Sequence, residues 1–322
     1  MDTLRLGTRG SELALFQANA VAALLSARAG VRCHVVIIKT SGDRLAEASL
    51  AQIGGKRLFV KEIEDALLAG EIDLAVHSSK DMPAVLPAGL LIGAVLPREE
   101  PLDAIVLPGP SGSQPIEEIE RAFAHGPRIG TSSIRRVAQL ARRFPKATFR
   151  PVRGNLGTRL RKLDAGDYDA LVLAAAGLRR LGRTDRITAT IPVELCMPAP
   201  GQGIIAVEIR EDDDNVRRIV AQIDDPDTAA ALRAERTVVT QLGGGCQMPI
   251  GALAEISGGQ VSVRGVVISP DGSRIASGAA TGSVADSERL GAAVAEQLLR
   301  EGAGDILADV QRAHAAVEGI QP

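Results

Sequence analysis

Aromatic residues make up only 2% of the 322 residues, and tryptophan is absent. Proteins that bind single-stranded nucleic acid stack bases on aromatic side chains, so this composition argues against that class. No paired ligand spacing links the four histidines, which are His34, His77, His125 and His314, and no two cysteines form a C-x-x-C motif. Protein zinc sites use closely spaced Cys and His ligands. The sequence therefore predicts neither a metal site nor a nucleic-acid partner.

Long apolar runs are missing as well, and none approaches the ~20 residues that a membrane-spanning helix needs. The N-terminus alternates like a strand from Met1 to Leu6 and lacks the basic flank and apolar stretch of a signal peptide. The three cysteines, Cys33, Cys196 and Cys246, are odd in number and far apart, which argues against a disulfide framework. We therefore expect a cytoplasmic protein that does not enter the membrane.

Charge is unevenly distributed along the chain, although the net charge is only -2. Residues 128–186 contain 13 Arg and 2 Lys against 4 acidic residues. A genome that favours Arg codons explains why Arg outnumbers Lys 31 to 6, but it does not explain this local excess. The middle third of the chain is therefore expected to bind something anionic.

Strand and helix patterns divide the chain into three parts. The first hundred residues read as βαβ units, with strands at 4–8, 33–39 and 73–77 and helices at about 11–27 and 58–69. The same order repeats with strands at 104–107, 128–130, 148–152 and 170–173 and helices near 116, from 132, and at 155–165. After a hinge-like segment at 197–203, a strand at 204–209 returns to the first sheet. From 226 the pattern is a helix, three strands around 253, 261–268 and 275–281, and helices at about 285–299 and 304–313.

We expect an α/β protein with two hinged α/β domains and a smaller C-terminal α+β domain. Domain 1 comprises residues 1–98 and 202–222, domain 2 residues 99–201, and domain 3 residues 223–322. Because two chain segments cross between the first two domains, a hinged cleft is expected there. Residues 40–57 are rich in small and polar residues, which predicts a mobile lid.

Basic and hydroxyl side chains gather at three predicted strand-to-helix turns. Gly130 to Arg136 combines a helix N-terminus with hydroxyls and two arginines, and Arg153 with Arg159 repeats the arrangement one turn later. Gly7 to Ser11 has the same character in the first domain. Free backbone N–H groups and guanidinium groups favour carboxylates or phosphates. The alternative is that the serines only cap helices and the arginines are solvated.

Two further segments carry candidate chemical groups. His77 to Pro83 places Lys80 beside Asp81 at a strand end, where an acid among bases can stabilise positive charge, although such pairs are also common on surfaces. Cys246 follows three glycines and is the candidate covalent anchor, because little side-chain cover is expected over its sulfur. Cys33 is expected in the core, and Cys196 is expected to pack at the hinge.

Taken together, these segments resemble the porphobilinogen deaminase (hydroxymethylbilane synthase) family from Leu4 through the C-terminal domain. The segments that carry the resemblance are Leu6 to Ser11, Gly54 to Lys56, Leu58 to Glu62, His77 to Pro83, Gly130 to Arg136, Arg153 to Leu160, Ala174 to Gly182, Pro200 to Gly203, and Gly244 to Gly251. Finding all nine in order indicates more than any one of them alone.

The resemblance implies a transferase of tetrapyrrole biosynthesis with two periplasmic-binding-protein-like (type II) domains. Four porphobilinogens are added in turn to a dipyrromethane cofactor that a thioether links to the cysteine matching Cys246, and ammonia leaves at each addition. Asp81 matches the carboxylate that stabilises the resulting cation. The positions that match cofactor- or substrate-binding residues are Arg9, Ser11, Lys80, Thr131, Ser132, Ser133, Arg135, Arg136, Arg153, Arg159 and Arg180.

The resemblance also implies that Lys56 and Phe59 belong to the lid and that the enzyme acts as a monomer. One departure is Arg57, since relatives often have Gly after the lid lysine. Two other classes stay open from the residues alone. A non-catalytic solute-binding protein would use the cleft and the arginines but neither Asp81 nor Cys246, and a nucleic-acid binder would use only the basic middle part.

Overall fold

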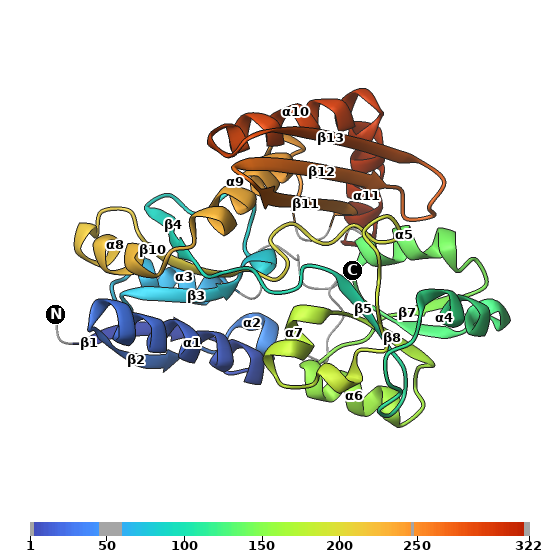
Figure 1. Cartoon of the computed structure of the whole chain (residues 1–322), viewed down its shortest axis with the longest axis horizontal. Coiled ribbons are helices and arrows are strands. Elements are labelled where there is room, and N and C mark those ends of the chain that lie inside the picture. Colours follow the sequence, from blue (N-terminus) through green and yellow to red (C-terminus); the bar gives the residue numbers. More distant parts are fainter. Residues whose placement is uncertain (1–2, 45–59, 246–247, 319–322) are drawn as a thin grey trace.

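The computed structural model describes residues 3–44, 60–245 and 248–318, without the side chains of residues 43, 44 and 314–318. Within these ranges the chain forms two five-stranded sheets and one three-stranded sheet, each with its own helices (Figure 1). The expected α/β class with a smaller C-terminal α+β part is confirmed. None of the described helices is long and apolar enough to cross a membrane.

The first sheet is built mainly from the N-terminal part of the chain. Its strands in spatial order are β2 (Arg32–Ile37), β1 (Thr3–Thr8), β3 (Leu74–Ser78), β10 (Ile205–Arg210) and β4 (Leu90–Val95). The first three are parallel, and β10 is antiparallel to both of its neighbours. Its helices are α1 (Glu12–Ala29), α2 (Ser41–Arg44), α3 (Lys61–Leu68) and α8 (Asp214–Val220). Its main core includes Leu4, Leu6, Val21, Leu25 and Val207, all fully buried.

The second sheet has the same plan. Its strands in spatial order are β7 (Thr148–Arg150), β6 (Arg128–Gly130), β8 (Ala170–Ala174), β5 (Asp103–Val106) and β9 (Ala189–Thr190). Here β5 is the fourth strand and is antiparallel to both neighbours, as β10 is in the first sheet. The helices are α4 (Ile116–Ala122), α5 (Ile134–Arg143), α6 (Leu156–Asp164) and α7 (Ala175–Arg180). In each sheet the strand that arrives from the other one therefore takes the same place.

Two segments run side by side between these sheets, one from β4 to β5 and one from β9 to β10. Leu96 donates its N–H to the Ile205 carbonyl at 3.1 Å, and Glu99 donates to the Gly203 carbonyl at 3.0 Å. At Gly203, which has φ +85°, a Cβ would lie 2.3 Å from the Glu99 oxygen, so the close approach requires glycine. The hinge is thus a pair of hydrogen-bonded strands of chain.

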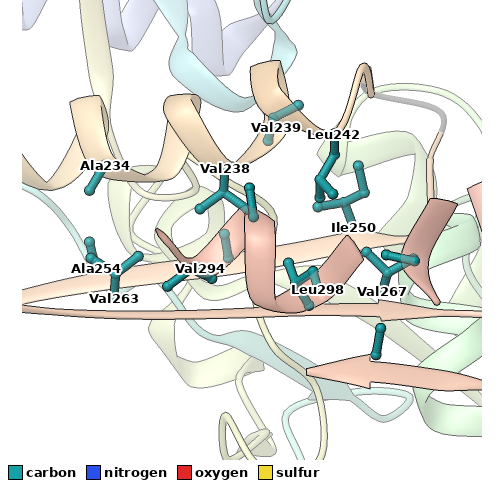
Figure 2. Close-up of a cluster of buried hydrophobic side chains, with 14 of the residues drawn as sticks. Ala234, Val238, Val239, Leu242, Ile250, Ala254, Val263, Val267, Val294 and Leu298 are labelled. Carbon is teal, nitrogen blue, oxygen red and sulfur yellow. The ribbon is translucent and has the colours of Figure 1, made fainter. Parts of the chain in front are cut away.

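The third sheet forms a separate layer with the last helices, shown in orange and red in Figure 1. It consists of β11 (Ile250–Ser257), β12 (Gln260–Ile268) and β13 (Ile275–Ser283), with α9 (Pro226–Gln241), α10 (Ser287–Arg300) and α11 (Ala303–Glu318). Figure 2 shows the apolar faces of α9 and α10 meeting the sheet through Val238, Leu242, Val263, Val294 and Leu298. This burial of branched aliphatic side chains gives the layer its own core.

Several predicted boundaries differ from the structure for local reasons. Helix α5 begins at Ile134 because Ser133 caps it and accepts from the Arg136 N–H, whereas the sequence predicted a start at Ser132. Strand β7 ends at Arg150, directly before Pro151, which has no N–H to give to a ladder. Strands β4 and β9 and helices α7 and α8 were not predicted. In β4 the apolar pattern is interrupted by Gly93, where a Cβ would lie 2.7 Å from Ile209.

A buried carboxylate connects the hinge to the third layer. Glu235 of α9 is fully buried, and Arg98 donates to its Oε1 at 2.5 Å. Its oxygens also accept from the backbone N–H groups of Gly201 at 2.6 Å and Ala254 at 2.7 Å. Since Gly201 lies in the hinge and Ala254 in β11, one side chain holds three parts of the fold together.

Glu235→Ala is therefore expected to lower the free energy of unfolding by about 3 to 5 kcal/mol, because it removes the counter-charge of Arg98, whose side chain is only 13% exposed. Denaturant unfolding of the purified variant measures this. The control is Glu296→Ala, which removes an exposed ion pair with Arg300 on α10 and should cost about 1 kcal/mol or less. Equal effects of the two substitutions would contradict the structural role of Glu235.

Candidate active site

The turn after β3 presents Lys80 and Asp81 at the carboxyl edge of the first sheet. The strand is buried to His77, and a 3-10 turn follows at Ser79–Asp81. Ser79 donates its N–H to the Ile204 carbonyl at 2.9 Å, and Met82 is only 4% exposed. Because the turn is anchored on both sides, the orientation of Lys80 and Asp81 is set by the backbone.

A buried cluster forms where the chain enters the second sheet. Asp103, the first residue of β5, is fully buried and accepts from Arg135 at 2.8 Å and from Arg136 at 2.7 Å. Burial alone would raise the pKa of Asp103, but the charges of the two guanidinium groups outweigh it and hold that pKa far below its usual range. The carboxylate is therefore charged and fully paired.

The remaining contacts of these arginines also go to the protein. Arg135 donates to the Met197 carbonyl at 2.6 Å, and Arg136 donates to the Val172 carbonyl at 2.9 Å. The buried Nε of Arg136 has no hydrogen-bond partner. The sequence nominated both arginines as ligand-binding and missed Asp103, for which it holds no local signal. The structure shows that much of their bonding capacity serves the fold.

Lys80 lies beside this cluster. Its Nζ donates to the Gln202 Oε1 at 3.1 Å. The pKa of Lys80 is lowered to about 8, chiefly by burial and in addition by the charges of Arg136 and Arg135, while the charges of Asp81 and Asp103 oppose the shift. Gln202 was named only within a motif, so its side-chain role was also missed.

Arg159 joins the same group from helix α6. Asn155 caps this helix by accepting from the Thr158 N–H at 2.9 Å, and the Nε of Arg159 donates to the Gly154 carbonyl at 2.8 Å. Burial lowers the pKa of Arg159, the charges of Arg136 and Arg153 add to this, and the charge of Asp81 opposes it.

The structure thus brings together seven charged groups from both sheets, as the electrostatic influences on Lys80 and Arg159 show. They are Lys80, Asp81, Asp103, Arg135, Arg136, Arg153 and Arg159.

The hydroxyls of the Gly130 to Arg136 turn hold the turn itself. Thr131 is buried and its Oγ1 accepts from the Ser133 N–H at 3.3 Å, while Ser132 donates to the Val152 carbonyl at 2.8 Å. Ser133 caps α5 by accepting from the Arg136 N–H at 3.4 Å. The capping alternative is therefore confirmed for Ser133.

The other nominated residues lie around the group. Arg9 and Ser11 follow β1, which is parallel to β3, so they lie at the same sheet edge as Lys80. Ser11 caps α1, accepting from the Ala14 N–H at 3.3 Å. Arg180 donates to the Gly203 carbonyl at 2.7 Å, and burial lowers its pKa to about 10, against the charge of Glu99.

Three nominated residues, Lys56, Phe59 and Cys246, lie outside the described residues, as does most of the expected lid. Burial raises the pKa of Cys33 to about 11 and, as the largest influence, that of Cys196 to about 12. Both thiols are therefore protonated at neutral pH and poor nucleophiles. Among the described residues, no group of three or more His, Cys, Asp or Glu could hold a metal ion.

Comparison with known proteins gives a consistent result over nearly the whole chain. Residues 4–218 match the family model described as porphobilinogen deaminase, dipyromethane cofactor binding domain, and residues 229–300 match porphobilinogen deaminase, C-terminal domain. A relative in Geobacter metallireducens named porphobilinogen deaminase is 46% identical over 98% of this chain and 97% of its own length. One of the same name in Geobacter sulfurreducens is 46% identical over 96% of this chain and 95% of its own.

Solved structures give weaker matches. The Bordetella pertussis BvgS periplasmic VFT2 domain has a TM-score of 0.39 and 18% identity, covering 69% of this chain and 86% of that one. An ancestral arginine-binding protein has a TM-score of 0.36 and 16% identity, covering 69% and 91%.

The pKa of Lys80 predicts a pH-dependent stability. A lysine whose pKa is lower in the folded than in the unfolded protein destabilises the fold while charged, and this penalty is relieved as pH rises from about 8 towards the ordinary lysine pKa of 10.5. Lys80→Met should therefore gain stability relative to wild type at pH 7, and this gain should shrink by about 2 kcal/mol by pH 10.

Denaturant unfolding at both pH values measures the difference, and Lys146→Met at an exposed position is the matched control for removal of a positive charge. A stability difference between Lys80→Met and wild type that stays constant with pH would contradict the lowered pKa.

Proposed function

The chain belongs to the porphobilinogen deaminase family, and from that premise we propose that Asp81 is its catalytic carboxylate and Cys246 the attachment point of its cofactor. Enzymes of this family are hydroxymethylbilane synthases, transferases that condense four porphobilinogen molecules head to tail onto a dipyrromethane and release ammonia. The cofactor is attached to a cysteine. The solute-binding and nucleic-acid-binding alternatives are therefore not retained.

The proposal for Asp81 is supported by its place among cations. It is exposed at the sheet edge, and its charge acts on both Lys80 from the first sheet and Arg159 from the second. When ammonia leaves porphobilinogen, positive charge develops on the pyrrole. A carboxylate held in a preformed position stabilises such charge without reorganising solvent.

The basic groups around Asp81 fit a pyrrole chain that carries an acetate and a propionate on each ring. Lys80, Arg153 and Arg159 contribute positive charge, and the buried Nε of Arg136 has no protein partner. When bound, the dipyrromethane supplies the pyrrole carbon that the first porphobilinogen joins. Each charge-assisted hydrogen bond to a carboxylate stabilises binding by about 1.5 to 3 kcal/mol, so a few suffice to orient the chain.

The other nominated binding residues are proposed to contact carboxylates of the cofactor or substrate. Their positions at strand-to-helix turns support this, although several also hold the fold. They are Arg9, Ser11, Thr131, Ser132, Ser133, Arg135 and Arg180.

The division into domain 1 (1–98 and 202–222), domain 2 (99–201) and domain 3 (223–322) is likewise proposed. It is supported by the separate sheets, since β10 belongs to the first and β5 to the second. We also propose a cytoplasmic monomer. The seven charged groups of the site lie close together within one copy of the chain, and the free thiols of Cys33 and Cys196 suit a reducing compartment.

Asp81→Asn is expected to keep the cofactor but to lower porphobilinogen turnover by about 100- to 1,000-fold, because the amide cannot stabilise developing positive charge. Ammonia release and hydroxymethylbilane formation measure turnover, and intact mass shows whether the cofactor is present. Asp212→Asn, at an exposed position, is the control for loss of an acidic side chain. Ammonia release close to wild type in Asp81→Asn would rule out the proposed role.

Cys246→Ser is expected to remove the covalent cofactor and with it all turnover. The intact mass of the wild-type protein should exceed the sequence mass by that of a dipyrromethane and give a colour with Ehrlich's aldehyde, and the variant should show neither. Cys33→Ser should keep both signals. A native protein purified from porphobilinogen-producing cells that is unmodified and Ehrlich-negative would sink the attachment hypothesis.

A further inference from the structure

Gln202 lies in the hinge segment and is fully buried. Its Oε1 accepts from Lys80 at 3.1 Å, and its Nε2 donates to the Pro101 carbonyl at 2.7 Å and to Asp103 at 2.8 Å. The side chain therefore touches the first sheet's active-site turn, the other hinge segment and the second sheet's buried cluster.

The orientation of this amide follows from its partners. Lys80 can only donate hydrogen bonds and the Asp103 carboxylate can only accept them, so the oxygen must face the lysine and the nitrogen the aspartate. A flipped amide would oppose like groups at both ends. Gln202 thus accepts a hydrogen bond from a cation, Lys80, and donates one to an anion, Asp103.

The backbone of Gln202 is held as firmly as its side chain. Its N–H donates to the Ala199 carbonyl at 2.9 Å, and its carbonyl accepts from Arg98 Nε at 2.9 Å. Both neighbours are glycines with positive φ, and a Cβ on Gly201 would lie 2.6 Å from the Ser79 Oγ. Close packing therefore leaves the amide little freedom to move.

A neutral amide has a consequence that a carboxylate would not have. It orients the Lys80 ammonium without neutralising it, so the positive charge is kept beside Asp81. It also gives Asp103 an extra donor beyond Arg135 and Arg136. Glutamate at this position would pair with the lysine, repel Asp103 and lose both donated hydrogen bonds.

We propose that Gln202 is a positioning residue that holds Lys80 against the Asp103 cluster and so sets where the lysine's charge lies relative to Asp81. Because its side chain is fully buried, it acts through Lys80 rather than by direct contact with cofactor or substrate. This inference rests on the proposed function, in which Lys80 binds a carboxylate of the pyrrole chain. What distinguishes Gln202 is that its one side chain is hydrogen-bonded both to the active-site turn, at Lys80, and to the second sheet, at Asp103.

The test compares Gln202→Met and Gln202→Glu with wild type in kcat/KM for porphobilinogen across pH 6 to 10. Both variants should keep the covalent cofactor, which the intact mass of each protein checks. Gln202→Met should lower kcat/KM by about 10- to 100-fold, the size expected for a hydrogen bond to a charged group. The alkaline limb of the profile should move to lower pH in Gln202→Met and to higher pH in Gln202→Glu, because the first loses an acceptor for the ammonium and the second adds a negative charge.

Gln139→Met is the matched control. Gln139 is also a buried glutamine that bonds the hinge, through Met197, but none of its hydrogen bonds is to Lys80. Gln139→Met should lower the stability of the fold without shifting the pH profile of kcat/KM. Equal profiles for the two glutamine-to-methionine variants would mean that Gln202 only supports the fold, and the inference would be wrong.

A double-mutant cycle separates this inference from the function on which it rests. In a Lys80→Met background, Gln202→Met should lower kcat/KM no further. Additive losses would overturn the positioning role while leaving that of Lys80 intact. If Lys80→Met alone left kcat/KM unchanged, the proposed role of Lys80 would fail, and the role of Gln202 with it.

Discussion

The ion pairing of Asp103 with Arg135 and Arg136 is the constraint on which the packing of β5, helix α5 and the hinge depends. An ionised carboxylate with no exposure is costly unless its charge and lone pairs are satisfied. Here the donors come from helix α5 and the hinge, while the aspartate begins β5. The three elements must therefore stay together for the charge to be tolerated, and Lys80 takes its position from the same cluster through Gln202.

The cluster also changes how the basic middle part of the chain is understood. Its excess of arginine suggests one large anionic ligand, yet many of these side chains have partners within the protein. Arg135 and Arg136 neutralise Asp103. In addition, Arg128 pairs with Asp169 and Arg186 with Asp164, each at 2.7 Å. A smaller group around Asp81 is left to act on the substrate. Local charge in a sequence therefore overstates the charge that a ligand meets.

Much of the architecture could be predicted from local patterns. Alternating strands and helices, the cap at Ser11, and the three strands of the last layer all follow from period and capping chemistry, which act over a few residues. Strand β4 was not predicted because Gly93 interrupts its apolar pattern. A side chain at this position would collide with Ile209, which is far away in the sequence. The start of α5 shifted by two residues because Ser133 caps the helix while the hydroxyl of the adjacent Ser132 bonds to Val152.

By itself, the sequence determined the class of fold, the turns that carry Lys80, Asp81 and the arginines, and, through its motifs, the family. These depend on local residue order, which folding does not alter. Only the tertiary structure decided which charges are shared within the protein. Asp103, Gln202 and Glu235 look ordinary in sequence, and they matter because folding removes them from water and leaves each with a partner 99 to 137 residues away. Burial makes such contacts strong, and burial is a property of the fold rather than of any segment.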